Sequence, residues 1–351
     1  MMIPQSGKVQ TVLGIVEPES LGITLPHEHI LLDNSNWVTE PVAATERHLA
    51  RQPLMLQNLG WILMNYDKSL DNSRLTDEET AIDEIMLFKR NGGLTIADVT
   101  PRGLGNDPLG LVRVARATGV NIVMGTAYYE ASTHPSGVEE MTEQQIATEF
   151  VNDIQMGIGE TGVRAGLIGE IGCSWPLARS ELKVLRAAAM AQRETGALLM
   201  IHPGRNESAP LEIIEVLVNA GADITHTVIC HISRTMFDSA SRLELAGAGC
   251  YLEYDLFSHS WHYFAGAAGP TCMPSDPERV DQICELIAAG YERQILVSHD
   301  ICWKMYLSRY GGHGYSYILK YGVPLMRWKG MSEDQIHTIL VDNTHRALQF
   351  L

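Results

Sequence analysis

Eight short apolar runs, spread along the whole chain, constrain its fold more than any other feature. Each has the length and composition of a buried parallel strand, and amphipathic stretches typical of helices separate most of them. Strands that alternate with helices indicate a parallel α/β protein, and eight such units favour a closed (β/α)8 TIM barrel. The runs are 22–29, 94–100, 120–129, 166–172, 197–204, 227–233, 250–257 and 294–300.

An open, doubly wound sheet would show the same alternation. No G-x-G-x-x-G or G-x-x-x-x-G-K turn follows an early strand, however, which weighs against a nucleotide-binding sheet of that kind. The barrel is therefore the preferred α/β fold. Its helices are predicted at 76–93, 110–119, 143–158, 180–196, 209–223 and 276–292.

Three segments fall outside the repeating units. Residues 1–20 predict a small N-terminal cap or hairpin, and residues 33–75 form an insertion after the first strand. Residues 302–328 follow the last strand, and long loops at the C-terminal face of a barrel tend to build its pocket. We expect residues 1–351 to form a single domain. It should end in a helix over 332–351 that begins at a Ser332–Gln335 capping box and breaks near Asn343.

Composition narrows the classes of function. The 351 residues are 45% hydrophobic, which suffices for one large core, and the formal net charge is −16. An acidic chain repels phosphate backbones, so no nucleic-acid partner is expected. Neither a signal peptide nor a membrane span is recognisable, and none of the six cysteines forms a C-x-x-C pair. We expect reduced cysteines, a cytoplasmic location and no membrane partner.

Potential metal ligands occupy the C-terminal ends of five otherwise apolar strands, where a barrel places its active site. In a strand with a period of two, the imidazoles of His27 and His29 share one face and Glu28 points away. Each ligand alone has an ordinary explanation, such as a hydrogen-bonded core histidine. Their joint occurrence is hard to explain by packing and predicts a metal site. The predicted ligands are His27, His29, Glu170, His202, His231 and Asp300.

Six such ligands exceed the needs of one zinc ion and suit two divalent ions bridged by a carboxylate. Glu170 is the expected bridge, with His27, His29 and Asp300 on one ion and His202 and His231 on the other. A hydroxide shared by both ions would attack the substrate, and Asp300 would shuttle the proton as the catalytic residue. Zinc is the expected metal, although the same ligands accept Mn, Co, Fe or Ni.

These residues, together with GEIGCSWPL (169–177), HPGR (202–205) and SHDI (298–301), resemble the phosphotriesterase family of the amidohydrolase superfamily over nearly the whole chain. The family's phosphotriesterases bridge their metals with a carboxylated lysine. Glu170 stands at that place here, as in the phosphotriesterase-related branch. The resemblance therefore implies hydrolysis of small N-acyl anionic compounds, such as N-acetyltaurine cleaved to taurine and acetate in taurine metabolism. It also implies a possible homodimer.

A sulfonate or carboxylate substrate needs a cation near the metals. Arg205 and Arg234 follow two of the metal-binding histidines, and arginine offers a planar fork for oxyanions. Each is equally compatible with a solvated or paired role, as are Lys304, Arg309 and His313, the weaker candidates on the last loop. Other residues are predicted to line the pocket, and each could equally serve only to pack the core. They are Tyr128, Tyr129, Tyr254, His259 and Trp261.

Two further functions stay open from the residues alone. The same metal site would serve a lactonase or a weak phosphotriesterase. A catalytically weak barrel that binds a hydrophobic ligand is the third alternative, although such a protein would have no use for a proton-shuttling carboxylate.

Overall fold

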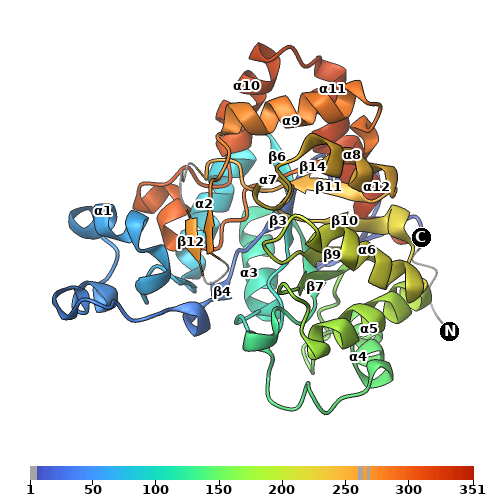
Figure 1. The fold of residues 1–351 in the computed structure, drawn as a ribbon, viewed down its shortest axis with the longest axis horizontal. Helices are drawn as coiled ribbons and strands as arrows, with labels where there is room; N and C mark the ends of the chain where they lie inside the picture. Colours follow the sequence, from blue (N-terminus) through green and yellow to red (C-terminus); the bar gives the residue numbers. More distant parts are fainter. Residues whose placement is uncertain (1–5, 260–263, 267–268) are drawn as a thin grey trace.

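Eight parallel strands form a barrel in the computed structural model, which describes residues 6–259, 264–266 and 269–351 (Figure 1). Each predicted run overlaps one of them, and the strands lie in the order β14-β11-β10-β9-β8-β7-β6-β3. In chain order they are β3 (Ile23–Glu28), β6 (Gly93–Asp98), β7 (Asn121–Thr126), β8 (Leu167–Gly172), β9 (Leu198–His202), β10 (Thr227–Ile229), β11 (Tyr251–Tyr254) and β14 (Ile295–Val297). The predicted TIM-barrel fold is confirmed.

The first strand and the segment after the last strand close the barrel through a few hydrogen bonds. Among the described residues, no backbone ladder pairs β14 with β3. Instead, Ser298 Oγ accepts a hydrogen bond from the His27 backbone N–H at 3.2 Å and lies 2.7 Å from the His27 carbonyl oxygen. The Asp300 backbone N–H also donates to that carbonyl at 3.3 Å. The barrel is therefore nearly closed, and this junction brings together two of the strand ends that carry predicted metal ligands.

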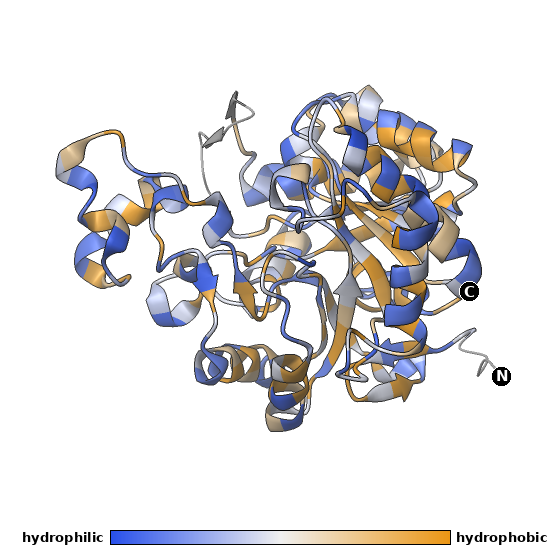
Figure 2. Cartoon of the chain, turned by 90° about the horizontal axis from the view of Figure 1, so that it is seen from below, coloured by the Kyte–Doolittle hydropathy of each residue, from blue (hydrophilic) through white to orange (hydrophobic). Residues whose placement is uncertain are grey.

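Helices cover the outside of the barrel, and hydrophobic residues concentrate in the central strands (Figure 2). Capping chemistry sets several helix ends: Thr142 and Gln145 form a capping box, and Gly119 and Gly196 end two helices in the left-handed conformation. The six predicted helices are α2 (Glu78–Arg90), α3 (Pro108–Thr118), α4 (Glu143–Gln155), α5 (Arg179–Thr195), α6 (Ala209–Asn219) and α9 (Asp276–Ala288). Two more that the sequence analysis missed, α7 (Ile232–Thr235) and α8 (Ser239–Gly247), follow β10.

The segments outside the repeat have structure of their own. Strands β1 (Val9–Thr11) and β2 (Gly14–Val16) make an antiparallel hairpin before the barrel. The insertion begins at β4 (Leu32–Asp33) and ends at β5 (Arg74–Leu75), which pair antiparallel, and it carries α1 (Leu56–Met64). It projects from one side of the barrel (Figure 1).

The C-terminal helix begins at the predicted capping box, where Ser332 accepts from the Gln335 backbone N–H. Helix α11 (Glu333–His337) continues through a π-helical segment, Thr338–Asp342, into α12 (Asn343–Leu348). The predicted break near Asn343 is therefore wrong, because the backbone stays helical and only widens its turn. No helix in the described part of the chain is long and apolar enough to cross a membrane.

Local irregularities decide which side chains enter the barrel. The buried hydrophobic residues form two clusters, and Leu167 of β8 belongs to the smaller one, together with Val123 and Leu198 of the neighbouring strands. Strict alternation would then turn Glu170, three residues later, to the opposite face. A register shift between Ile168 and Ile171 breaks the alternation, and a similar shift interrupts β3 between Leu25 and Glu28.

Candidate metal centre

The structure brings all six predicted ligands together at the C-terminal end of the barrel. Glu170 Oε1 is central: it lies 2.7 Å from His231 Nε2, 2.8 Å from His202 Nδ1 and 3.5 Å from His27 Nε2. Asp300 Oδ1 lies 3.3 Å from His29 Nε2 and 3.7 Å from His27 Nε2. The residues that meet here come from β3, β8 and β9 and from the segments after β3, β10 and β14.

An unsatisfied nitrogen shows that this arrangement suits a cation. His27 Nε2 is buried and has no hydrogen-bond partner among the described residues. Such an atom carries a desolvation cost that a bound metal would relieve. The same imidazole belongs to three sets of converging ligand atoms among the described residues, and two of them consist of predicted ligands: one with Glu170 and His231, the other with His29 and Asp300. The donors are imidazoles and carboxylates, which suit zinc and similar ions.

Carboxylates and a hydroxyl hold three of the imidazoles from behind. His27 Nδ1 lies 3.0 Å from Glu253 Oε2, and His29 Nδ1 lies 2.9 Å from Thr100 Oγ1. His231 Nδ1 lies 2.9 Å from Asp255 Oδ1. Because Nδ1 is engaged in this way, each Nε2 is directed at the predicted metal positions. Histidines that bind metals commonly have such a hydrogen-bond partner on their second ring nitrogen.

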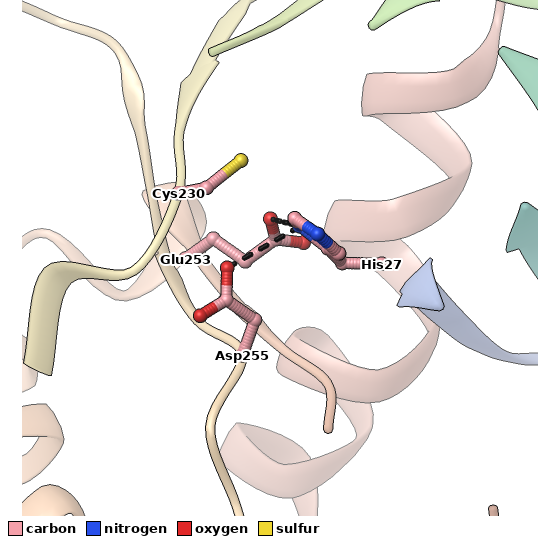
Figure 3. A group of neighbouring side chains, drawn as sticks. All are labelled: His27, Cys230, Glu253 and Asp255. Carbon is pink, nitrogen blue, oxygen red and sulfur yellow. Dashed lines mark hydrogen bonds and ion pairs between the residues drawn. The ribbon is translucent and has the colours of Figure 1, made fainter. Parts of the chain in front are cut away.

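Glu253 and Asp255 were missed in the sequence analysis. Both belong to the buried run at 250–257, and the signal was present, because two acids in an apolar strand need partners. Figure 3 shows them beside His27 and Cys230. These four residues also converge closely enough to hold a metal. Because Glu253 and Asp255 already engage Nδ1 of His27, we interpret the group as support for the imidazoles.

Two of the predicted ligands have left-handed backbones, which residues other than glycine seldom adopt. His231 has a φ of 56° and Asp300 a φ of 53°. The His231 backbone N–H donates to Asp255 Oδ2 at 2.9 Å. Such conformations persist where surrounding contacts enforce them.

Glu28 provides the corresponding contacts around Asp300. Its buried carboxylate accepts hydrogen bonds from the backbone N–H groups of His299 at 2.9 Å and Ile301 at 3.0 Å, the residues on either side of Asp300. Ser298 Oγ and His299 Nδ1 also lie within hydrogen-bond distance of Glu28. Glu28 contacts the segment around Asp300 and not the imidazoles of His27 and His29, and this orientation lets it position Asp300.

Charges in the site compensate one another. Burial raises the pKa of the Glu170 carboxyl, but His202 and His27 outweigh it, so this pKa lies well below its usual value. Burial acts likewise on Asp300, where the His29 hydrogen bond and the His27 charge bring the pKa below its usual range. Burial lowers the pKa of His202 to about 3, despite the opposing charge of Glu170.

A cavity of about 520 Å³ opens above the predicted ligands. Its walls combine charged and aromatic side chains, and Asp300 reaches it while also touching the imidazoles below. Lining residues from the metal cluster are His29, Glu170, His202 and Asp300. Others include Trp37, Tyr66, Tyr129, Glu130, Arg205, Arg234, His259, Trp303 and Tyr306.

Of the predicted substrate-binding residues, Arg205, Arg234 and His259 line this cavity. Tyr128 does not: its hydroxyl donates to Glu149 Oε2 at 2.7 Å, and its ring packs 5.8 Å from that of Phe150 on α4. Successive residues of an extended chain face opposite ways, so Tyr129 enters the cavity instead.

The entry of Tyr129 depends on a glycine. A Cβ atom on Gly172 would stand 2.2 Å from the Glu130 backbone nitrogen, so only glycine allows the segment of Tyr129 and Glu130 to approach β8 so closely. The Tyr129 hydroxyl lies 3.1 Å from His202 Nδ1.

The remaining candidates lie elsewhere. Lys304 pairs with Asp71 at 2.7 Å, Arg309 lies 3.8 Å from Asp83, and the His313 ring packs against Tyr317. Tyr254 is buried in the larger hydrophobic cluster. Trp261 lies outside the described residues.

The insertion and the loop after β14 together roof the cavity. The Asn72 carbonyl accepts from the Lys304 backbone N–H at 2.8 Å, and Asn72 Oδ1 accepts from the Met305 backbone N–H at 2.9 Å. Trp37 and Tyr66 come from the insertion, and Trp303 and Tyr306 come from the loop.

Comparisons with known proteins agree with this architecture. The model of the phosphotriesterase family matches residues 7–348. Human N-acetyltaurine hydrolase is 43% identical over 98% of this chain and 99% of its own length. A resiniferatoxin-binding protein from Rhodobacter sphaeroides is 36% identical, with a TM-score of 0.95 over 99% of this chain and 97% of its own. A lactonase from Listeria monocytogenes is 25% identical, with a TM-score of 0.81 over 98% of this chain and 99% of its own.

Proposed function

Because the chain belongs to the phosphotriesterase family, we propose that this metal-dependent amidohydrolase cleaves the amide bond of small N-acyl anionic compounds. N-acetyltaurine, which would yield taurine and acetate, is the proposed substrate. One observation carries the proposal: four of the predicted metal ligands line the same cavity as two arginines, Arg205 and Arg234. The relatives named N-acetyltaurine hydrolase support the same substrate.

The proposed site holds two divalent ions, with zinc expected. His27, His29 and Asp300 would bind one, His202 and His231 the other, and Glu170 would contact both. Such ions, when bound, lower the pKa of a water molecule toward neutrality and polarise the carbonyl that is to be cleaved.

The chain's own groups then move protons and position the substrate. Asp300 accepts the proton of the attacking water, because its carboxylate touches His29 and its side chain remains partly exposed to the cavity. Arg234 and Arg205 bind the sulfonate end as planar donors. His259 stacks on Tyr306, with ring centroids 4.0 Å apart, and forms a wall of the same cavity.

A lactonase is the second candidate, and the structural relationship to the Listeria monocytogenes enzyme favours it. A neutral lactone, however, has no anionic group to pair with the two arginines. The Rhodobacter sphaeroides relative, which is named for ligand binding, favours a catalytically weak binding barrel as the third.

A substrate panel tests the proposal. N-acetyltaurine is compared with N-ethylacetamide, which offers the same amide without the sulfonate, and with a lactone and an aryl phosphotriester. Every assay is repeated after chelation and again after metal is restored. We expect chelator-sensitive cleavage of N-acetyltaurine and little of the neutral amide. Preferred cleavage of the lactone or the triester would overturn the substrate, and no cleavage by metal-loaded protein would support the binding barrel.

A further inference from the structure

Tyr66 reaches from the insertion to Arg205, one of the two arginines proposed to bind the substrate's anionic group. The two side chains form a hydrogen bond, and both line the cavity. A guanidinium group can only donate hydrogen bonds, so the Tyr66 hydroxyl oxygen is the acceptor. Tyr66 follows α1 in the insertion, whereas Arg205 belongs to the segment after β9. The contact therefore joins the roof of the cavity to its wall.

Arg205 occupies an electrostatically unfavourable position. Burial and the positive charge of Arg234 lower the pKa of the Arg205 guanidinium to about 10, which still leaves it charged near neutral pH. Two like charges beside one cavity repel each other. A long arginine side chain also has many rotamers, and holding it in one of them costs entropy. A hydrogen bond to Tyr66 opposes both effects, because it favours the rotamer that faces the cavity.

Asn72 and Trp303 hold Tyr66 in turn. The side-chain amide of Asn72, which is fully buried, donates to the Tyr66 carbonyl oxygen at 3.1 Å. The Trp303 ring packs edge-on against the Tyr66 ring, with centroids 5.1 Å apart. Asn72 is also hydrogen-bonded to the loop after β14, which carries Trp303. These contacts fix both the backbone and the ring of Tyr66, so its hydroxyl is a firm support for Arg205.

We propose that Tyr66 is a positioning residue for the anion site, where it holds the Arg205 guanidinium in the orientation that receives the substrate's sulfonate or carboxylate. The inference rests on the proposed function and adds a residue of the insertion to it. An arginine that is already in place loses less rotamer freedom when the anion binds, so affinity rises without a further contact to the substrate. Selectivity for anionic over neutral amides therefore depends in part on the roof.

A double-mutant cycle measures whether Tyr66 acts through Arg205. Taurine binding to zinc-loaded wild type, Tyr66→Phe, Arg205→Met and the double variant is measured by calorimetry. We expect Tyr66→Phe to weaken taurine binding about 5-fold or more when Arg205 is present, and by less than about 2-fold in the Arg205→Met background. Equal losses in the two backgrounds, or no loss in either, would overturn the proposal.

Tyr251 and Arg346 offer a matched control, because their side chains form a hydrogen bond of the same kind. Tyr251 is the first residue of β11, at the end of that strand away from the cavity, and Arg346 lies in α12. Tyr251→Phe should lower the melting temperature about as much as Tyr66→Phe and change taurine affinity by less than about 2-fold. A similar loss of taurine affinity in both variants would show that general stability is the cause and would refute the positioning role.

Asn72→Ser tests the same chain of contacts from behind Tyr66. Serine is too short to reach the Tyr66 carbonyl oxygen, so this variant loosens the support of Arg205 and keeps the Tyr66 hydroxyl. We expect taurine binding to weaken about 3-fold or more, and by less than about 2-fold in the Arg205→Met background. An undiminished loss in that background would refute the positioning role, even if Tyr66→Phe failed to fold.

Hydrolysis assays on the same preparations separate the positioning role from the proposed function. In Tyr66→Phe, KM for N-acetyltaurine should rise while kcat stays within about 2-fold, because the lost interaction concerns binding. Cleavage of N-acetyltaurine by wild type together with an additive cycle would refute the positioning role and leave the proposed function standing. A coupled cycle in protein that cleaves only the lactone would overturn the proposed substrate and leave the positioning role standing. Failure of loaded protein both to bind taurine and to cleave N-acetyltaurine would overturn both.

Discussion

Asp255 holds His231 at two points: Oδ1 lies 2.9 Å from the ring Nδ1, and Oδ2 accepts the backbone N–H at 2.9 Å. One carboxylate thus orients the imidazole and supports its left-handed backbone. We expect Asp255→Asn to lower metal affinity about 10- to 100-fold, because the amide cannot accept both hydrogen bonds. Competition with a chelator measures this. Asp153→Asn, at a buried carboxylate paired with Arg102, is the control, and equal losses in the two variants would contradict the assignment.

Glu28→Gln tests how Asp300 is positioned. The amide replaces one acceptor of backbone N–H groups with a donor, so we expect kcat to fall about 10- to 100-fold. Glu84 offers a matched control, because its buried carboxylate accepts the backbone N–H groups of Ser308 at 3.1 Å and Arg309 at 2.8 Å. Glu84→Gln should lower the melting temperature similarly and spare kcat. If both variants lose kcat equally, the effect is one of general stability.

Glu170→Ala is predicted to abolish activity and metal retention together, because the Glu170 carboxylate is central to the cluster. Elemental analysis after gel filtration measures retained metal, and circular dichroism checks the fold. Full activity in this variant would remove the bridging assignment.

Asp300→Asn addresses the proton shuttle. Loss of a group that accepts a proton is expected to lower kcat about 100- to 10,000-fold. Taurine binding, which depends on the arginines, should change by less than about 3-fold, a factor equivalent to under 1 kcal/mol. Calorimetry and steady-state kinetics on one preparation give both values. Unchanged kcat would exclude Asp300 as the shuttle.

The raised pKa of the Glu130 carboxyl should make the stability of the metal-free protein depend on pH. Burial, partly offset by Arg234, raises the pKa of its carboxyl from 4.5 to about 7. Between these values the folded state holds a proton that the unfolded state has released, so stability falls as the pH rises through this window. Glu130→Gln removes that contribution. Urea unfolding should show the variant gaining up to about 3 kcal/mol on wild type between pH 4.5 and 7, and a constant difference would contradict the shifted pKa.

The sequence predicts the barrel and its strand ends because burial and helix periodicity are local properties. The ligands at those ends could be named for the same reason. The alternation of faces along β8 does not predict the inward direction of the Glu170 side chain, however. That direction follows from the register shift between Ile168 and Ile171, which depends on the neighbouring strands.

Other features depend on contacts distant in sequence. Glu28 meets the segment after β14 some 270 residues later, and no local pattern announces that contact. The choice of Tyr129 over Tyr128 depends on where β7 ends and on the space left beside Gly172. Helix α8 was missed because its short sequence, SASRLELAG, has a weak amphipathic pattern.

Asn72 clasps the insertion to the loop after β14, and both segments lie outside the repeating barrel. The two segments therefore form one structural unit. A chimera that received only the insertion of a relative would break the clasp, whereas one that received both segments would keep it. When substrate specificity changes among such barrels, we expect the insertion and the loop after β14 to change together. The predicted metal ligands below them should stay the same.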